Sequence, residues 1–168
     1  MKKLHTLFFF FTVLWLVPVL LVAVAPESRA GTKMPAFALK SVYDGKVVDS
    51  NSFKGKVLFV TFFGTYCPPC VAEMPSLISL QKEKAGAGFS VIGLSLDRIS
   101  APQVALFVKR KGVNYPVLMA DRKTIMDFGG IYGIPTAFLI NKRGNVVKMY
   151  TGYVEHRVLE KDIRSLLN

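Results

Sequence analysis

The fold of this 168-residue chain is decided by the stretch Gly64-Thr65-Tyr66-Cys67-Pro68-Pro69-Cys70, which contains its only two cysteines. The residues just before it, Val57-Leu58-Phe59-Val60-Thr61-Phe62-Phe63, form a short apolar run rich in β-branched and aromatic side chains. Such a run predicts a strand buried on both faces. The apolar residues after the cysteines recur at helical spacing, and they are Val71, Met74, Leu77 and Ile78. We therefore expect Cys67 and Cys70 where a buried strand ends and a helix begins.

This position favours redox chemistry at the two cysteines. A thiol at a helix N-terminus is close to free N–H groups and to the positive end of the helix dipole, and both stabilise the nucleophilic thiolate. A zinc site fits less well, since it needs about four ligands and the chain has no third cysteine and only one histidine beyond residue 25. A haem attachment site needs histidine where the chain has Val71. Two inert core cysteines remain an alternative, which would leave the prolines between them unexplained.

The N-terminal 25 residues differ from the rest of the chain. Lys2 and Lys3 precede nineteen residues, 7–25, of which only Thr12 is polar. This pattern predicts either a secretory signal peptide, with cleavage near Ala30, or an N-terminal membrane anchor, which we favour. The two lysines keep the N-terminus in the cytoplasm, so the rest of the chain is exported on either interpretation. Residues 26–34 are expected to be a linker and residues 35–168 a single domain.

Composition limits the range of partners. The chain has 22 Lys and Arg against 11 Asp and Glu, a formal net charge of +11. A basic domain beside a membrane is attracted to anionic lipid headgroups or acidic partners, although the same charge also suits an ordinary soluble surface. No basic run is interleaved with aromatic residues, so we expect no nucleic-acid partner. We expect neither a metal nor another cofactor, and the single cysteine pair leaves no framework of structural disulfides.

The remaining chain alternates predicted strands and helices. We expect strands at 35–42, 47–48, 57–63, 89–96, 115–120, 136–140 and 146–150, and helices at 68–85, 101–111, 123–128 and 154–167, with a helical turn at 50–53. Residues 43–46 contain Asp-Gly, which predicts a hairpin turn. The last helix is expected to bury one stripe, formed by Val154, Val158, Leu159, Ile163, Leu166 and Leu167. The order of elements predicts an α/β fold with a central mixed sheet flanked by helices.

Four stretches resemble the thioredoxin superfamily, in particular its membrane-associated extracytoplasmic branch of the TlpA/ResA type. They are residues 53–57 before the buried strand, residues 63–70 around the cysteines, Glu73 with Pro75, and Gly133-Ile134-Pro135-Thr136, which is similar to the family's cis-proline loop. The resemblance covers nearly all of 35–168 and implies a thioredoxin-like fold. It also implies an N-terminal β-hairpin and a helix–strand insertion between residues 96 and 123. Tyr66 stands where the family usually has Trp, and Thr61 where plain thioredoxin has a buried Asp.

The resemblance implies a thiol–disulfide oxidoreductase. Cys67 would attack a partner disulfide and Cys70 would resolve the mixed disulfide. The family relationship also implies a substrate groove flanked by Tyr66, Pro68, Pro69, Ile134 and Pro135, with a cis bond before Pro135. The direction it favours is reduction of exported disulfide-containing proteins, such as apocytochrome c, with electrons from a membrane thiol relay of the CcdA/DsbD type.

Glu73 is a candidate general base for the resolving step. It lies three residues after Cys70, so both side chains fall on one helix face. That face should turn inward, because Met74 and Leu77 flank it. A partly desolvated carboxylate has a raised pKa and suits proton transfer near neutral pH. Thr61 cannot act as a base. The alternative is a solvated glutamate that only favours the helix dipole.

Two functions from other classes remain. A thiol peroxidase of the peroxiredoxin type would reduce peroxide at Cys67, but it normally has Thr three residues before the cysteine, and Thr65 is two before. A copper-delivery protein would bind metal through the two cysteines and a histidine, for which His156 on the last helix is a poor candidate.

Overall fold

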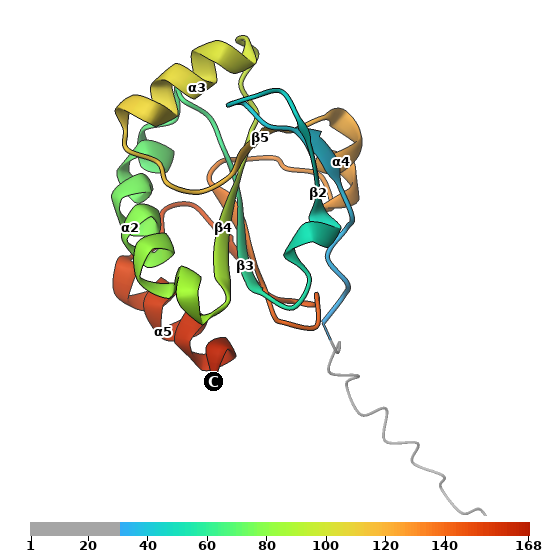
Figure 1. Ribbon diagram of the computed structural model, residues 1–168, viewed down its shortest axis with the longest axis vertical. Helices are drawn as coiled ribbons and strands as arrows, with labels where there is room; N and C mark the ends of the chain where they lie inside the picture. Colours follow the sequence, from blue (N-terminus) through green and yellow to red (C-terminus); the bar gives the residue numbers. More distant parts are fainter. Residues whose placement is uncertain (1–30) are drawn as a thin grey trace, which may run out of the picture.

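The computed structural model describes residues 31–168, and a mixed five-stranded sheet forms its centre (Figure 1). The strand order is β5-β4-β3-β6-β7. These strands are β3 (Val57–Phe63), β4 (Phe89–Ser95), β5 (Val117–Met119), β6 (Thr136–Ile140) and β7 (Val146–Thr151). β3, β4 and β5 are parallel, whereas β6 runs antiparallel to β3 and β7 antiparallel to β6. This arrangement confirms the expected thioredoxin-like α/β fold.

Helices cover one face of this sheet, and a smaller layer covers the other (Figure 1). The helices on the first face are α2 (Pro68–Lys84), α3 (Ala101–Arg110) and α5 (His156–Leu167), and the short 3₁₀ turn η2 (Ala85–Ala87) follows α2. The second face carries α4 (Arg122–Asp127), a two-stranded sheet of β1 (Ala38–Lys40) and β2 (Val47–Asp49), and the 3₁₀ turn η1 (Ser50–Phe53). The expected hairpin and the expected helix–strand pair, α3 and β5, are both present.

β3 and β4 are buried along their whole length, as the apolar run predicts. Successive side chains of β3 point to opposite faces. Phe59 and Phe63 therefore pack in the core under α2, α3 and α5, whereas Leu58, Val60 and Phe62 pack in the core under the N-terminal hairpin and α4. This double burial fixes β3 in the middle of the molecule, with the cysteines directly beyond its C-terminal end.

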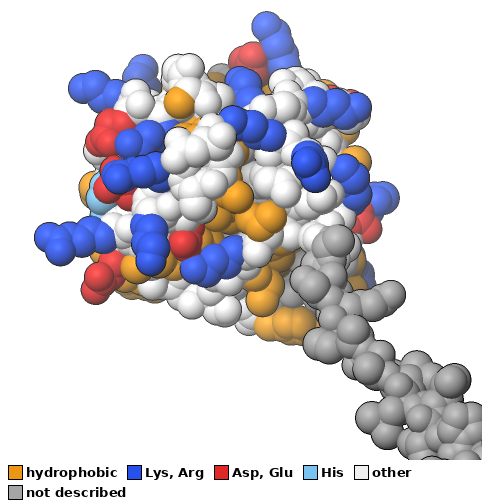
Figure 2. Space-filling view, turned by 90° about the horizontal axis from the view of Figure 1, so that it is seen from below, with side chains coloured by type: hydrophobic (Ala, Val, Ile, Leu, Met, Phe, Trp, Pro, Cys, Tyr) orange, Lys and Arg blue, Asp and Glu red, His pale blue; other side chains and the backbone are white. Residues whose placement is uncertain are grey.

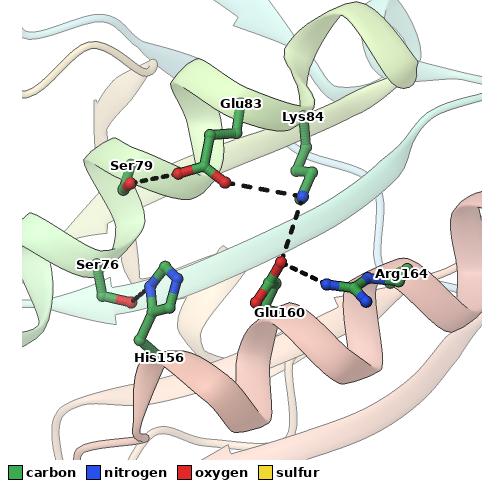
Figure 3. A network of polar contacts seen from close by, with 7 residues as sticks. All are labelled: Ser76, Ser79, Glu83, Lys84, His156, Glu160 and Arg164. Carbon is green, nitrogen blue, oxygen red and sulfur yellow. Dashed lines mark hydrogen bonds and ion pairs between the residues drawn. The ribbon is translucent and has the colours of Figure 1, made fainter.

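The last helix buries a narrower stripe than expected. Leu159 and Ile163 are fully buried, but Val158 is 41% exposed, so its predicted burial is wrong. Val158 precedes Leu159 by one residue, which rotates it about 100° around the helix and away from the sheet. Polar contacts between α2 and α5 lie beside this stripe (Figure 3). They include the pair of Lys84 with Glu160, and Glu160 also accepts from Arg164.

The chain before β1 is held against the sheet. Thr32 accepts a hydrogen bond from the Val146 N–H, and the Met34 N–H donates to Gly144. The end of the expected linker, residues 31–34, is thus attached to the β6–β7 hairpin. The expected leader or anchor at 1–25 and the first part of the linker lie outside the described residues. Within residues 31–168, no helix has both the length and the apolar character that crossing a membrane requires.

Candidate active site

Cys67 and Cys70 form a disulfide at the start of α2. Cys67 has an extended backbone and is the N-cap residue, and Pro68 and Pro69 occupy the first two positions of the helix. Because proline has no N–H group, Cys70 supplies the first free amide of the helix. That N–H donates to the Cys67 Sγ over 3.3 Å. The one free donor of the first turn therefore points at the sulfur of Cys67, where it stabilises a thiolate.

Tyr66 and Ile134 lie side by side next to Gly64. A Cβ on Gly64 would lie 2.7 Å from the Tyr66 ring and 3.2 Å from the Ile134 Cδ1, so only glycine leaves room for both side chains. Tyr66 is 69% exposed although Cys67, which follows it, is buried. The structure thus places an exposed aromatic ring directly before Cys67.

The loop before β6 faces the dithiol. Its Ile134–Pro135 bond is cis, as the resemblance implies. The Ile134 carbonyl oxygen lies 3.6 Å from the Cys67 Sγ. The Pro135 carbonyl accepts a hydrogen bond from the Gly152 N–H over 2.8 Å, which attaches the loop to the end of β7. The backbone of residue 134 is therefore held directly against the sulfur that is expected to react.

Asp97 holds the loop that precedes the cysteines, and sequence reasoning missed it. Its carboxylate accepts the Thr65 N–H at 3.1 Å, the Thr65 hydroxyl at 2.6 Å and the Ser95 hydroxyl at 2.7 Å. The register between β3 and β4 could have identified Asp97 as a partner of this loop. Phe63 pairs with Ser95 at the parallel ends of β3 and β4. Thr65 and Asp97 each follow two residues later, so they meet at the edge of the sheet where sites of parallel sheets form.

Glu73 is buried, with 2% of its surface exposed, so the solvated alternative is wrong. Burial raises the pKa of the Glu73 carboxyl to about 7, and the hydrogen bond from the Val154 N–H, 3.0 Å long, opposes the rise. Cys70 and Glu73 share a cavity of about 10 Å³ with Thr61, Tyr115 and Pro135. A cavity of that volume has room for about one water molecule. The buried Thr61 hydroxyl has no hydrogen-bond partner within residues 31–168.

The geometry does not favour the thiol peroxidase or the copper-delivery protein. The Thr65 hydroxyl is bound to Asp97. His156, the candidate copper ligand, has its Nδ1 paired with the Ser76 hydroxyl at 2.9 Å on the α2–α5 surface (Figure 3). In the part of the chain that the structure describes, no three His, Cys, Asp or Glu side chains cluster as a metal site would require.

Comparison with known proteins agrees with this site. The family model described as Redoxin matches residues 29–167, which include both cysteines and both halves of the sheet. The chain belongs to the redoxin family. Thiol-disulfide oxidoreductase ResA of Halalkalibacterium halodurans is 32% identical over 136 residues, 80% of this chain and 75% of that protein. ResA of Bacillus subtilis is 34% identical over 122 residues, 73% of this chain and 67% of that protein.

A solved structure extends the agreement to the fold. The crystal structure of a thiol:disulfide interchange protein of the thioredoxin family from Chlorobium tepidum is 37% identical, with a TM-score of 0.75 over 82% of this chain and 97% of that one. This redoxin is therefore a ResA-like member of the thioredoxin superfamily, and it is a thiol–disulfide oxidoreductase with a Cys67–Cys70 redox pair.

Proposed function

We propose that this ResA-like redoxin reduces disulfides of exported proteins on the outer side of the cytoplasmic membrane. One observation carries the proposal: the Cys67 sulfur accepts the Cys70 N–H of α2 and lies 3.6 Å from the Ile134 carbonyl oxygen, and the exposed Tyr66 ring lies next to Ile134. This arrangement combines thiolate stabilisation with an exposed aromatic surface that an extended substrate can contact.

The proposed reaction begins with the reduced dithiol. The Cys67 thiolate attacks one sulfur of the partner disulfide, and the other partner sulfur leaves and takes a proton. The Cys70 thiolate then attacks the Cys67 sulfur of the mixed disulfide and releases the second partner thiol. The partner gains two electrons and two protons, and the chain ends with the Cys67–Cys70 disulfide that the structure contains.

Glu73 is the proposed base for the second attack. Its pKa of about 7 leaves it partly ionised at neutral pH, where a base is most effective. The cavity that it shares with Cys70 supports proton transfer through about one water molecule. The Val154 N–H fixes the carboxylate, so the base is held in place before the thiol needs it.

The proposed substrate groove runs along the exposed residues around Cys67. The exposed Pro68 and Pro69 at the start of α2 would line its base, and Tyr66 and Ile134 would line one side. Pro135 has no N–H group and cannot donate a backbone hydrogen bond to a substrate strand. We therefore expect a substrate strand to pair with the backbone of the preceding residue, Ile134.

The proposed location and partners depend on the N-terminal sequence. Lysines followed by the apolar run 7–25 support export and membrane attachment, with residues 35–168 as the exported domain. Electrons would come from a membrane thiol relay of the CcdA/DsbD type. Apocytochrome c is the proposed substrate among exported disulfide proteins, and it follows from the TlpA/ResA resemblance.

The redox potential tests the proposed direction. Residues 31–168 are equilibrated in glutathione buffers and the Cys67–Cys70 disulfide is quantified. A reductant should have a potential near that of thioredoxin, about −270 mV, whereas a potential near that of DsbA, about −120 mV, would identify an oxidant. Peroxide consumption with a thiol donor, or copper binding by the reduced chain, would instead support one of the two alternatives.

A further inference from the structure

A second site lies at the opposite end of the sheet from the dithiol. It is a hollow of about 460 Å³ between the start of the described chain, the segment from η1 to β3 and the β6–β7 loop. Apolar side chains line its interior, namely the buried Phe53, Leu58 and Ile140 and the half-buried Met34. Five exposed cations surround it, and they are Lys33, Lys54, Lys56, Lys142 and Arg143. We refer to these residues as the basic pocket.

The positive charge of the basic pocket is not neutralised by the domain. No carboxylate lines the pocket, and none of its five cations forms an ion pair within residues 31–168. Two of the ammonium groups are held by backbone carbonyls instead. Lys33 donates to Arg143 and Lys142 donates to Leu167, each over 2.6 Å. Five like charges around one hollow repel each other, so the pocket favours an anionic occupant.

The basic pocket is also close to the apolar N-terminal run. Lys33 follows Ala25 by eight residues, and eight extended residues span at most about 28 Å. If residues 7–25 lie in a bilayer, the pocket cannot be far from its surface. The view from this end of the molecule shows Lys and Arg side chains around exposed hydrophobic side chains (Figure 2). That combination suits the interface of a membrane, where phosphates lie next to apolar chains.

We infer that the basic pocket binds the phosphate headgroups of anionic phospholipids and thereby docks the domain on the membrane. This inference rests on the proposed membrane attachment. The lysine and arginine side chains neutralise the lipid phosphates, and the apolar interior accepts the less polar part of the headgroup region. The pocket and the dithiol lie at opposite ends of β3, whose length of six residue steps is about 20 Å. Docking therefore sets Cys67 about 20 Å from the docked end of the domain.

Lysine acylation in vesicles tests the inference. The full chain is reconstituted into phosphatidylcholine vesicles with and without about one third phosphatidylglycerol, treated with a water-soluble acylating reagent, and analysed by mass spectrometry. Each cation near an anionic surface strengthens binding by about fivefold. Labelling of Lys54 and Lys56 should therefore fall by at least about fivefold with phosphatidylglycerol, and Lys109 on α3 should not change. About 0.5 M salt should restore the labelling.

A pair of double variants with the same change of charge provides the control. Lys54→Gln with Lys56→Gln should abolish the protection of Lys33 and Lys142, whereas Lys109→Gln with Arg110→Gln, the same change of charge on α3, should leave it intact. Equal labelling in both vesicle types would overturn the inference. Equal protection by inorganic phosphate in phosphatidylcholine vesicles would also overturn it, since the site would then bind a soluble anion.

The same experiment separates this inference from the proposed function. A chain that washes off phosphatidylcholine vesicles with carbonate lacks membrane attachment, and the docking inference falls with it. A chain that stays attached but shows no protection contradicts the docking alone. Insulin reduction by the same samples reports on the redox activity, and a loss of that activity would contradict the proposed reaction without affecting the labelling result.

Discussion

Glu73 and Asp97 are the two carboxylates that the fold buries near the dithiol, and they differ in their partners. Glu73 accepts one backbone hydrogen bond and lines a small cavity together with Cys70. Asp97 accepts from both the N–H and the hydroxyl of Thr65 and fixes the loop that carries Tyr66 and Cys67. We therefore propose proton transfer for the first and positioning for the second.

Replacing the carboxyl of Glu73 should separate the two steps of exchange. Glu73→Gln keeps the size and the acceptor for the Val154 N–H but cannot take a proton. Attack by Cys67 should be almost unchanged, whereas resolution by Cys70 should slow by about 10²-fold if proton transfer limits it. Stopped-flow detection of the mixed disulfide between about pH 5 and 9 measures both steps. An unchanged resolution rate and pH profile would show that Glu73 is not the base.

The raised pKa of Glu73 also predicts how stability changes with pH. The carboxyl loses its proton near 4.5 in the unfolded chain and near 7 in the folded chain. Between these values the folded state binds more protons, so the free energy of unfolding falls as pH rises. The shift corresponds to about 3 kcal/mol. Other carboxyls with lowered pKa act in the opposite direction, so the loss is measured as a difference between two proteins. Between about pH 4 and 8, the free energy of unfolding in urea should fall by about 3 kcal/mol more for the oxidised wild type than for Glu73→Gln; identical pH dependence of the two proteins would contradict it.

Asp97→Asn should loosen the loop without unfolding the domain. Hydrogen bonds to a charged group contribute about 1.5–3 kcal/mol. The amide of Asn would bind the loop less strongly, and a cost of about 1.4 kcal/mol in positioning Cys67 would reduce kcat/KM for insulin by about tenfold. Asp127→Asn is the control, because within residues 31–168 that exposed carboxylate pairs only with Lys123 on α4. If both variants lost the same small amount of activity, Asp97 would not position the site.

At the scale of elements, the site forms because β3 and β4 end together and α2 begins just beyond them. β3 spans residues 57–63, the range that its apolar run predicts, since a strand buried on both faces is a local pattern. The contacts that complete the site are not local. Thr65 and Asp97 are 32 residues apart, and Glu73 and Val154 are 81 apart. The sequence therefore predicted the elements and the dithiol, but not the partners that register and packing bring to them.

The rotation of α5 about its axis is a second feature that the sequence did not predict. Both Val158 and Leu159 fit an apolar helix, but only contact with α2 and β3 decides which one faces the core. Leu159 faces the core, and Val158 lies about 100° away from it around the helix. The apolar spacing predicted the helix and could not select between the two side chains.

This difference gives a stability prediction for α5. Leu159→Ala leaves a cavity under the helix and should lower the free energy of unfolding by about 2–5 kcal/mol. Val158→Ala, at the adjacent and 41% exposed position, should cost less than about 1 kcal/mol. Urea unfolding of the two variants measures both values. Comparable losses would mean that the helix is rotated relative to the structure described above.

At the scale of the whole molecule, the sheet separates two chemically distinct ends. The C-terminal ends of β3 and β4 carry the dithiol, and the opposite end carries the basic pocket next to the start of the described chain. The same central strand, buried on both faces, holds the two ends at a fixed separation. A thiol–disulfide oxidoreductase built in this way can be held at one surface while its cysteines meet partners at the other.

Capture of the mixed disulfide tests the central claim, that Cys67 exchanges disulfides and Cys70 resolves them. Residues 31–168 are prepared with Cys70→Ser or with Cys67→Ser, reduced, mixed with insulin and analysed by mass spectrometry. The Cys70→Ser protein should accumulate one stable adduct through Cys67, and the Cys67→Ser protein should form almost none. Accumulation with Cys67→Ser and none with Cys70→Ser would reverse the two roles and contradict the account.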